Sequence, residues 1–300
     1  MPGWLEPWIL LTLAAAFLQN LRSVWQKQLS GRLSLLGATS VRFTFALPLA
    51  WLLLAILQPA VLVPAGADFW FYAAGGALAQ IAATWALLRT FAGRGFAVGT
   101  TLSKTEVLQT VLFAWLLLGE GVSLLAATGI AVSLLGVILL SLPPRTAVLS
   151  PGATPDHNAY AFGLLAGSGF ALSAVCYRGA ALSVGVESFL DAAAVTLAWV
   201  LTLQSVLLIL WLGLRDPVQL RATVRQWRRT APVGMAGMLA SLCWFSAMTL
   251  HHAAYVRALG QVELLFAFVA SLCWFRERIR PLEWIGACTL VGGILLLIWP

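Results

Sequence analysis

Apolar runs long enough to cross a lipid bilayer recur along the whole 300-residue chain. A membrane-spanning helix needs about 20 predominantly apolar residues. Runs of that length follow one another so closely that no stretch is polar enough to cover a water-exposed domain. With 61% hydrophobic and only 10% charged residues, the composition excludes a soluble globular protein. The sequence therefore predicts an all-α integral membrane protein embedded in the lipid bilayer.

Glycine, proline and charged residues divide the apolar sequence into ten predicted transmembrane helices. They are residues 8–27, 33–57, 69–90, 96–118, 122–142, 159–180, 186–212, 231–251, 253–275 and 282–299. The central connection PPRTAVLSPGATPDHN, residues 143–158, carries four prolines and is the predicted linker. It separates a first five-helix repeat, residues 1–142, from a second, residues 159–300. The first run lacks a basic leader, so we expect a retained helix and not a signal peptide.

Lysine and arginine residues are distributed unevenly between the connections. Thirteen follow the first, third, fifth, seventh and ninth predicted helices, whereas Arg178 and Arg257 were assigned to the other side. Positive connections face the cytoplasm, which predicts a bacterial inner-membrane protein with both termini on the outer, periplasmic side. Topology then explains the net charge of +7, and no nucleic-acid partner is predicted. The four cysteines match no metal-site spacing, so neither a metal nor another cofactor is expected.

The basic stretch RDPVQLRATVRQWRRTAP, residues 215–232, has two interpretations. Leu220, Val224 and Trp227 recur at helical spacing, each followed by an arginine. Such a segment could lie along the inner leaflet as an amphipathic helix that holds anionic lipid. The alternative is a loop whose arginines only fix the orientation of the chain.

An internal repeat relates the two halves of the chain. A shift of 157 positions lays residues 91–142 on 248–299, and ten of the 52 positions are identical. The informative coincidences are polar or glycine positions: Glu106 with Glu263, Glu120 with Glu277, Gly129 with Gly286, and Gly136 with Gly293. A shift of 153 similarly aligns the stretch that ends at Leu57 with the one that ends at Leu210. The halves are therefore predicted to share one fold.

The odd number of helices in each half predicts that the second half enters the membrane upside down. Inverted repeats of this kind place a binding site near the middle of the membrane, where corresponding helices meet around a central cavity. Glu106 and Glu263 are each about midway along their predicted helices. We expect both at that site.

Two stretches carry a family resemblance. GTTLSKTEVLQTVLFAWLLLGEGVSLLAATGIAVSLLGVILL, residues 99–140, has a mid-helix Glu, a second Glu fourteen positions later and a glycine-spaced final helix; residues 260–297 repeat this pattern. The sequence resembles EamA-type members of the drug/metabolite transporter superfamily, and Arg42 stands where these proteins often carry an Arg. The resemblance implies ten helices in two inverted bundles and export or exchange of small metabolites and drugs.

One departure from the family pattern concerns the middle of the two glutamate-bearing helices. The family commonly has Pro directly after the mid-helix Glu, whereas this chain has Val107 and Leu264. No proline-induced kink is therefore predicted at these positions.

Charged residues inside the predicted helices are the first candidates for a functional site. Arg42, Lys104, Glu106 and Glu263 together represent about 10 kcal/mol of insertion cost unless they are paired or hydrated. On a continuous helix, Lys104 would point about 160° away from Glu106. One hypothesis is that the glutamates line the cavity and contact a cationic group or take up a proton. The other is that Arg42, Lys104 or Arg257 fixes each in an ion pair that holds the halves together.

A second group of polar side chains within the predicted helices could supply hydrogen bonds or stacking to a ligand. Interhelical packing is the alternative role for each of them. The group consists of Gln19, Asn20, Trp25, Gln80, Trp85, Tyr177, Trp244, Tyr255 and Gln261, of which Gln261 replaces Lys104 in the repeat.

The predicted function is secondary transport of small molecules by alternating access. The chain has no nucleotide-binding motif, and it lacks the motifs of intramembrane or metal-dependent hydrolases, so no catalytic residue is assigned. An intramembrane enzyme and a channel-like facilitator remain the alternatives. The sequence leaves open the substrate, proton coupling, the direction of transport, and whether the protein is a monomer or a homodimer.

Overall fold

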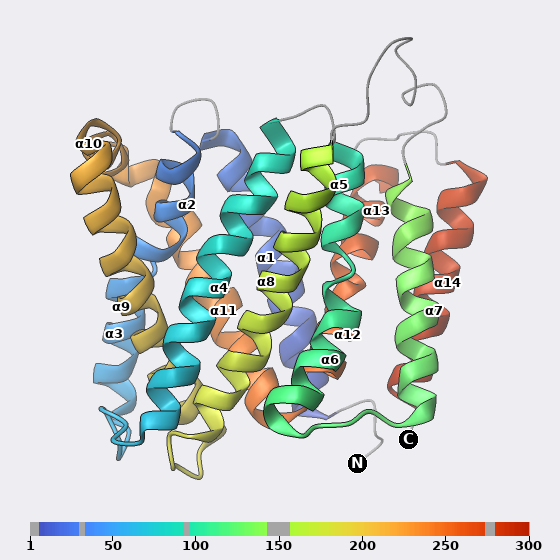
Figure 1. Cartoon of the computed structure of the whole chain (residues 1–300), viewed down its shortest axis with the longest axis horizontal. Helices are drawn as coiled ribbons and strands as arrows, with labels where there is room; N and C mark the ends of the chain where they lie inside the picture. The colour runs from blue at the N-terminus through green and yellow to red at the C-terminus, as the bar shows by residue number, and fades with distance from the viewer. Residues whose placement is uncertain (1–5, 30–33, 93–95, 143–156, 274–279, 300) are drawn as a thin grey trace.

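The computed structural model describes residues 6–29, 34–92, 96–142, 157–273 and 280–299. Within these ranges every regular element is a helix (Figure 1). The elements are α1 (Pro7–Leu29), α2 (Leu35–Thr44), α3 (Leu47–Leu57), α4 (Ala67–Ala92), α5 (Phe96–Ser103), α6 (Glu106–Leu118), α7 (Leu124–Ser141), α8 (His157–Leu182), α9 (Phe189–Arg215), α10 (Pro217–Arg225), α11 (Trp227–Leu250), α12 (Ala253–Leu259), the 3₁₀ turn η3 (Gly260–Val262), α13 (Glu263–Cys273) and α14 (Pro281–Leu297).

Each of the ten predicted segments coincides with helical structure, and three of them are interrupted. Within the described ranges, six helical segments are long and apolar enough to cross a membrane by themselves. The chain is therefore an all-helical membrane protein. Most of the predicted linker, residues 143–156, lies outside the described part of the chain, as do Arg32, Arg94, Arg145, Arg276, Arg278 and Glu277.

The basic segment between α9 and α11 is helical. Asp216 accepts a hydrogen bond from the backbone N–H of Gln219 and so caps α10, and Pro217 stands in the first turn, where its missing N–H costs nothing. Val218 and Val224 are exposed together with Arg221 and Arg225. The segment is therefore helical over Pro217–Arg225, while Trp227 already belongs to α11.

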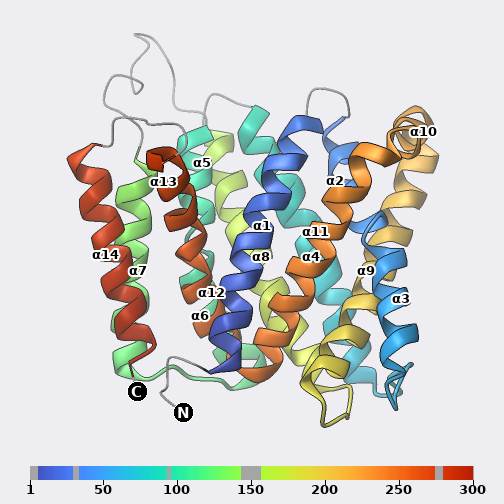
Figure 2. The same ribbon diagram turned by 180° about the vertical axis from the view of Figure 1, so that it is seen from behind.

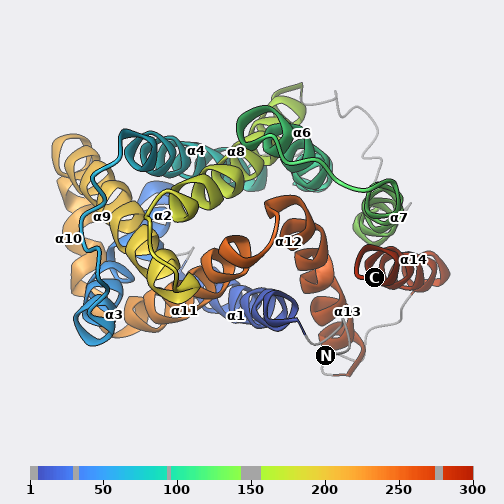
Figure 3. The same ribbon diagram turned by 90° about the horizontal axis from the view of Figure 1, so that it is seen from below.

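The helices stand side by side and alternate in direction (Figures 1 and 2). α1 begins and α14 ends at the same end of the bundle, and α10 lies at the opposite end. Seen along the helices, α4, α8 and α6 form one long side of the molecule, while α11 and α1 form the other (Figure 3). α3 and α9 pack together at one end of this arrangement, and α7 pairs with α14 at the other.

Glycines bring α7 and α14 into backbone contact. A Cβ at Gly129 would lie 2.8 Å from the backbone N of Leu297, and one at Gly286 would lie 2.9 Å from that of Leu140. Such close approach requires glycine and is a common way for helices to associate in lipid. Gly129 faces Gly293, and Gly136 faces Gly286. The shift of 157 lays Gly129 on Gly286 and Gly136 on Gly293, so each contact is the repeat equivalent of the other. The two contacts are therefore related by an approximate two-fold axis.

Three of the ten predicted segments are broken near their middle. Between α2 and α3 the cause is Pro48, whose ring nitrogen cannot donate to the carbonyl of Thr44. The other two breaks have no proline. The N–H groups of Lys104 and Thr105 bond three residues back, to Thr101 and Leu102. Ser103 and Thr105 also donate their hydroxyls to backbone carbonyls, which competes with regular α-helical structure.

The second break without proline occupies the equivalent place in the second half. Gly260, a weak helix former, begins the 3₁₀ turn η3, which separates α12 from α13. The shift of 157 lays the Lys104–Thr105 turn on Gln261 and Val262 of this turn. Glu106 and Glu263 therefore each begin the half-helix that follows a break.

Candidate functional site

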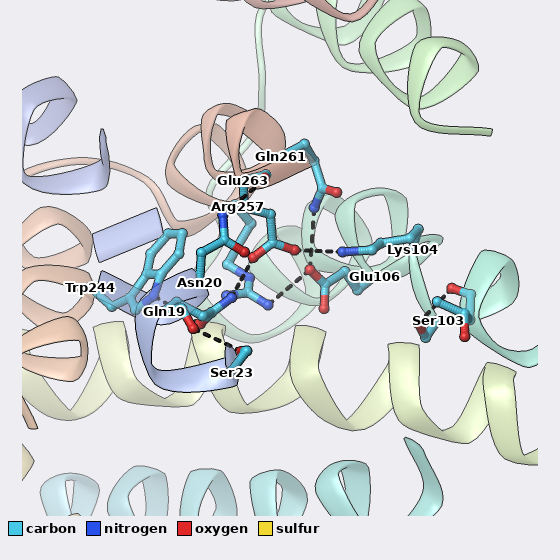
Figure 4. Close-up of polar contacts among 11 residues, drawn as sticks. Gln19, Asn20, Ser23, Ser103, Lys104, Glu106, Trp244, Arg257, Gln261 and Glu263 are labelled. Atoms are coloured by element: carbon cyan, nitrogen blue, oxygen red, sulfur yellow. Dashed lines mark hydrogen bonds and ion pairs between the residues drawn. The ribbon is translucent and has the colours of Figure 1, made fainter. Parts of the chain in front are cut away.

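The two equivalent breaks lie against each other in the interior of the bundle (Figure 4). Lys104 and Glu106 come from the α5–α6 break, and Gln261 and Glu263 from the α12–α13 break. A break leaves side chains at the end of each half-helix free to reach across to the other half of the chain. Seven of the thirteen candidate residues meet here: Gln19, Asn20, Lys104, Glu106, Trp244, Gln261 and Glu263.

Both mid-membrane glutamates are in ion pairs. Lys104 Nζ lies 2.5 Å from Glu263 Oε1, and both side chains are largely buried. Arg257 of α12 lies 2.9 Å from Glu106 Oε1. Each pair joins the two halves of the chain, as the structural hypothesis for these residues predicted. Pairing offsets part of the cost of placing four charges in a low-dielectric interior.

The contacts at the breaks are reciprocal. Lys104 of the first half donates to Glu263 of the second. Gln261, which the repeat aligns with Lys104, donates to Glu106 Oε1 at 3.3 Å. Each break residue therefore contacts the glutamate of the opposite half. This is the approximate two-fold relation that also links the glycines of α7 and α14.

The helical-wheel argument for Lys104 and Glu106 was wrong in its premise. It assumed one continuous helix over residues 96–118, whereas the chain turns at Lys104 and Thr105. The rotation of about 100° per residue gives side-chain directions only within one continuous helix, so it does not apply across a break. The conclusion that Lys104 and Glu106 are not each other's ion-pair partner nevertheless holds, because each pairs across the halves.

Helices α1 and α11 complete the surroundings of Glu263. Gln19 donates to Glu263 Oε2 at 2.6 Å, and Asn20 donates to the backbone carbonyl of Glu263 at 2.9 Å. Trp244 Nε1 donates to Gln19 Oε1 at 3.2 Å, and the guanidinium carbon of Arg257 lies 5.2 Å from the centre of the Trp244 ring. Glu263 is thus contacted by the side chains of Lys104, Gln19 and Asn20, within one polar network that joins α1, α11, α12, α13 and the α5–α6 break.

Two other candidates form a separate polar cluster. The hydroxyl of Tyr177 in α8 lies within donating distance of two oxygens, 2.9 Å from the carbonyl oxygen of Gly76 and 2.8 Å from Gln80 Oε1. Gln204 of α9 donates to the same Gln80 oxygen at 2.8 Å and to the Tyr177 hydroxyl at 3.1 Å. These contacts join α4, α8 and α9 and favour the packing role for Gln80 and Tyr177, although Gln204 Oε1 itself has no hydrogen-bond partner. The sequence prediction did not include Gln204.

The remaining aromatic candidates lie apart from the ion pairs. Trp25 packs beside Val41 and Val233. Trp85 makes an edge contact with Phe162 at 5.5 Å and a cation–π contact with Arg89. Tyr255 contacts the His251 ring, and its hydroxyl accepts from the N–H of Ser123 at 3.4 Å.

Arg42 makes no ion pair with either glutamate among the described residues, contrary to one form of the structural hypothesis. Its guanidinium lies 5.2 Å from the centre of the Phe43 ring. Arg22 of α1, buried and not among the candidates, interacts electrostatically with Arg42. The sequence did hold a signal for Arg22, because it follows Gln19 by three residues and so lies on the same face of the helix.

The two arginines assigned to the outer connections are ion-pair members inside the bundle: Arg178 is buried, and Arg257 is partly buried. Arg257 holds Glu106, and Arg178 lies within α8 and donates to both oxygens of Glu120 at 2.7 and 2.9 Å. Arg178 also donates to the carbonyls of Met248 and His251. Arg178 therefore fixes Glu120, which follows the end of α6, to the second half of the chain. Among the described residues no group of three His, Cys, Asp or Glu side chains could hold a metal ion.

A bundle of apolar helices with paired charges at two interrupted helices is the architecture of an integral membrane protein. The family model of the EamA-like transporter family matches residues 6–142 and 157–299. The chain therefore belongs to the EamA-like transporter family, whose members move small molecules across membranes and are not enzymes. The two matches cover nearly the whole chain and support a repeated architecture.

A solved crystal structure has the same fold. It aligns with a TM-score of 0.75 at 15% identity, over 96% of this chain and 95% of the other. No curated protein matches the sequence.

Proposed function

We propose that this chain is a secondary transporter that exports or exchanges small metabolites, such as amino acids or drug-like compounds, by alternating access. Ten transmembrane helices form two inverted five-helix repeats around a central cavity. The repeats are residues 1–142 and 159–300, joined by the linker 143–158. The alternating helix directions and the two-fold relation of the glycine contacts support this arrangement.

The observation that carries the proposal is the reciprocal contact of two broken helices. Lys104 reaches Glu263 and Gln261 reaches Glu106 across the two halves. Secondary transporters commonly bind their substrate at discontinuous helices where inverted repeats meet. Breaking and remaking these contacts would let the halves rock against each other without a nucleotide-driven domain.

The glutamates couple binding to this motion. Protonation of Glu263, or displacement of Lys104 by substrate, removes one of the ion pairs between the halves. The same holds for Glu106 and Arg257. A neutral carboxyl next to an unpaired cation in lipid is unfavourable, so proton uptake, pair opening and solute movement occur together. Gln19, Asn20 and Trp244 orient Glu263 and line the site.

The proposed location is the bacterial inner membrane, with both termini on the periplasmic side. Arg221, Arg225 and Arg228 are exposed at the α10 end of the bundle, opposite the end where α1 begins and α14 ends. Clustered arginines favour the cytoplasmic face. Burial of Arg178 and Arg257 removes the two exceptions to the charge asymmetry.

The experiment is solute counterflow in liposomes that contain the purified protein and no ATP. Liposomes are loaded with an unlabelled mixture of amino acids, short carboxylic acids, and amides and amines of the same size, and are diluted into the same compounds in radiolabelled form. A carrier accumulates label transiently because unlabelled solute leaves as label enters. Leakage to equilibrium without overshoot would indicate a channel, and the absence of protein-dependent flux would overturn the proposal.

A further inference from the structure

Within the described residues, two arginines beside the ion pairs, Arg22 buried and Arg42 partly buried, have no ion-pair partner. Arg22 of α1 is 8% exposed, and its Nε has no hydrogen-bond partner. Within the described ranges, neither Arg22 nor Arg42 of α2 takes part in a hydrogen bond or salt bridge through its guanidinium group. An unpaired charge inside a membrane protein is costly and points to a functional partner.

Both arginines lie where α1, α2 and α11 meet. A Cβ on Gly237 of α11 would be 3.3 Å from Arg22 Cδ and 3.9 Å from Arg42 Cγ. The stems of both arginines therefore pack against the backbone of Gly237, which brings the two side chains together. Arg42 interacts electrostatically with Arg22 and Arg257, and Arg22 interacts with Glu263. The two arginines are thus continuous with the charge network at the helix breaks.

The charges of this network do not balance. Arg22, Arg42, Lys104 and Arg257 are cationic, and Glu106 and Glu263 are the carboxylates that face them. The carboxylates are already occupied by Lys104 and Arg257. Two positive charges therefore remain in excess, and both belong to guanidinium groups, which bind carboxylate and phosphate oxygens through paired N–H donors.

We propose that Arg22 and Arg42 form the binding site for the anionic group, a carboxylate or phosphate, of the transported solute. This inference rests on the proposed transport function and gives its substrate class. A bound anion offsets the excess charge, so a solute crosses with its negative group between α1 and α2. A purely cationic solute would have to displace Lys104 or Arg257 from its glutamate and would leave the two arginines uncompensated.

Binding of matched compounds to purified, detergent-solubilised protein tests the substrate class. The probes are benzoate, benzamide and benzylamine, then succinate, succinamide and 1,4-diaminobutane, and glycerol phosphate. The readout is the melting temperature as a function of probe concentration. At least one carboxylate or the phosphate monoester should stabilise the protein, with no effect of its neutral or cationic counterpart. Stabilisation by the amines or amides alone, or by none of the probes, would overturn the inference.

Substitutions of Arg22 and Arg42 test whether these two side chains bind the anion. We expect the apparent Kd for the stabilising anion to rise about tenfold or more in Arg22→Gln and Arg42→Gln, because each removes a charge-assisted hydrogen bond. Arg221→Gln, the same substitution at an exposed position on α10, should leave the Kd unchanged. Retained anion binding in the Arg22→Gln/Arg42→Gln double variant would contradict the assignment.

The ligand-free protein gives a second, independent measurement. If the arginines await a ligand, their replacement removes unpaired buried charge, and the melting temperature should stay the same or rise. A marked fall would mean that the arginines are structural. Anionic lipid is the other source of phosphate, so the titration is repeated with phosphatidylglycerol in the detergent. Stabilisation by this lipid without stabilisation by any soluble anion would overturn the solute-site inference.

Failure of this inference is distinguishable from failure of the proposed function. Counterflow of neutral or cationic solutes without anion binding would leave the transporter standing and remove the anion site. Anion binding without counterflow of any solute would leave the anion site standing but remove the transport function, and with it the role of the anion as a transported solute.

Discussion

The Lys104–Glu263 pair shows how single residues determine the centre of this protein. The two charged atoms are 2.5 Å apart, and both side chains are largely buried. Gln19 adds a hydrogen bond to the second carboxylate oxygen. In such surroundings the cost of losing one partner exceeds the value of the pair itself, because the remaining charge cannot be solvated.

Glu263→Gln is therefore expected to destabilise the protein by about 3–5 kcal/mol, since it leaves Lys104 buried without its carboxylate. Glu283→Gln is the matched control. Glu283 pairs with Arg280 one helical turn away, and both side chains are more exposed, so its loss should cost about 1 kcal/mol or less. Denaturant unfolding in detergent, followed by tryptophan fluorescence, measures both.

The double variant Lys104→Met/Glu263→Gln removes the two charges together. It should recover most of the stability lost in Glu263→Gln, because no unpaired charge remains. Equal stability of the single variant and the wild type would show that the pair is hydrated and not buried.

Sequence could predict the glutamates and three possible ion-pair partners, but not which cation pairs with which glutamate. Glu106 and Glu263 stood out because acidic residues are rare in membrane helices and these two coincide in the repeat. The identities of the partners depend on where the two helices break and how they face each other, and hydropathy carries no such information. Arg22 was overlooked because α1 was considered for its Gln and Asn residues and not for its single arginine. Gln80 and Tyr177 were predicted as polar groups, but their bonds to each other and to Gln204 follow from packing alone.

At the scale of elements, the broken helices and the α7–α14 pair have different causes. Hydroxyl side chains and a glycine interrupt two helices without proline. Glycines at equivalent positions let α7 and α14 touch through their backbones. The repeat alignment had singled out these glycines, but it could not show that they face one another.

Gly293→Ala is expected to weaken the α7–α14 contact, because its Cβ would overlap the backbone at Ser133. Overpacking of this kind costs about 1–3 kcal/mol. Gly292→Ala, one position earlier on the same helix, meets nothing within 4 Å and should be neutral or slightly stabilising, since Ala is the better helix former. Thermal unfolding of the two variants side by side makes the comparison. Equal losses in both would mean that helix propensity, and not packing, governs α14.

At the scale of the whole molecule, most of the fold was predictable. Apolar runs placed all ten helical segments to within a few residues, because lipid thickness sets their length. The coincidence of Glu106 with Glu263 predicted the repeated architecture that the two family matches support. Sequence could not give the order of helices around the bundle, such as α1 beside α11 and α4 beside α8, because that order depends on side-chain fit between segments distant in the chain.

The proposed orientation predicts which ends of the bundle are reachable from outside the cell. In a background with the native cysteines replaced by serine, Arg225→Cys on α10 should resist a membrane-impermeant maleimide in intact cells and react after lysis. Gly121→Cys, in the exposed connection between α6 and α7 at the other end, should react in intact cells. The reverse pattern would place α10 and its arginines outside and overturn the orientation.

The most direct test of the central claim is the rate of counterflow in liposomes containing Glu106→Gln, Glu263→Gln or Glu283→Gln, normalised to the amount of folded protein. The two glutamates at the helix breaks are expected to control movement between the halves, so their loss should slow exchange by about tenfold or more, the scale of a lost charge-assisted contact. Glu283→Gln should exchange like the wild type. Wild-type exchange in both Glu106→Gln and Glu263→Gln would contradict the account, because the paired carboxylates would then hold the structure without taking part in transport.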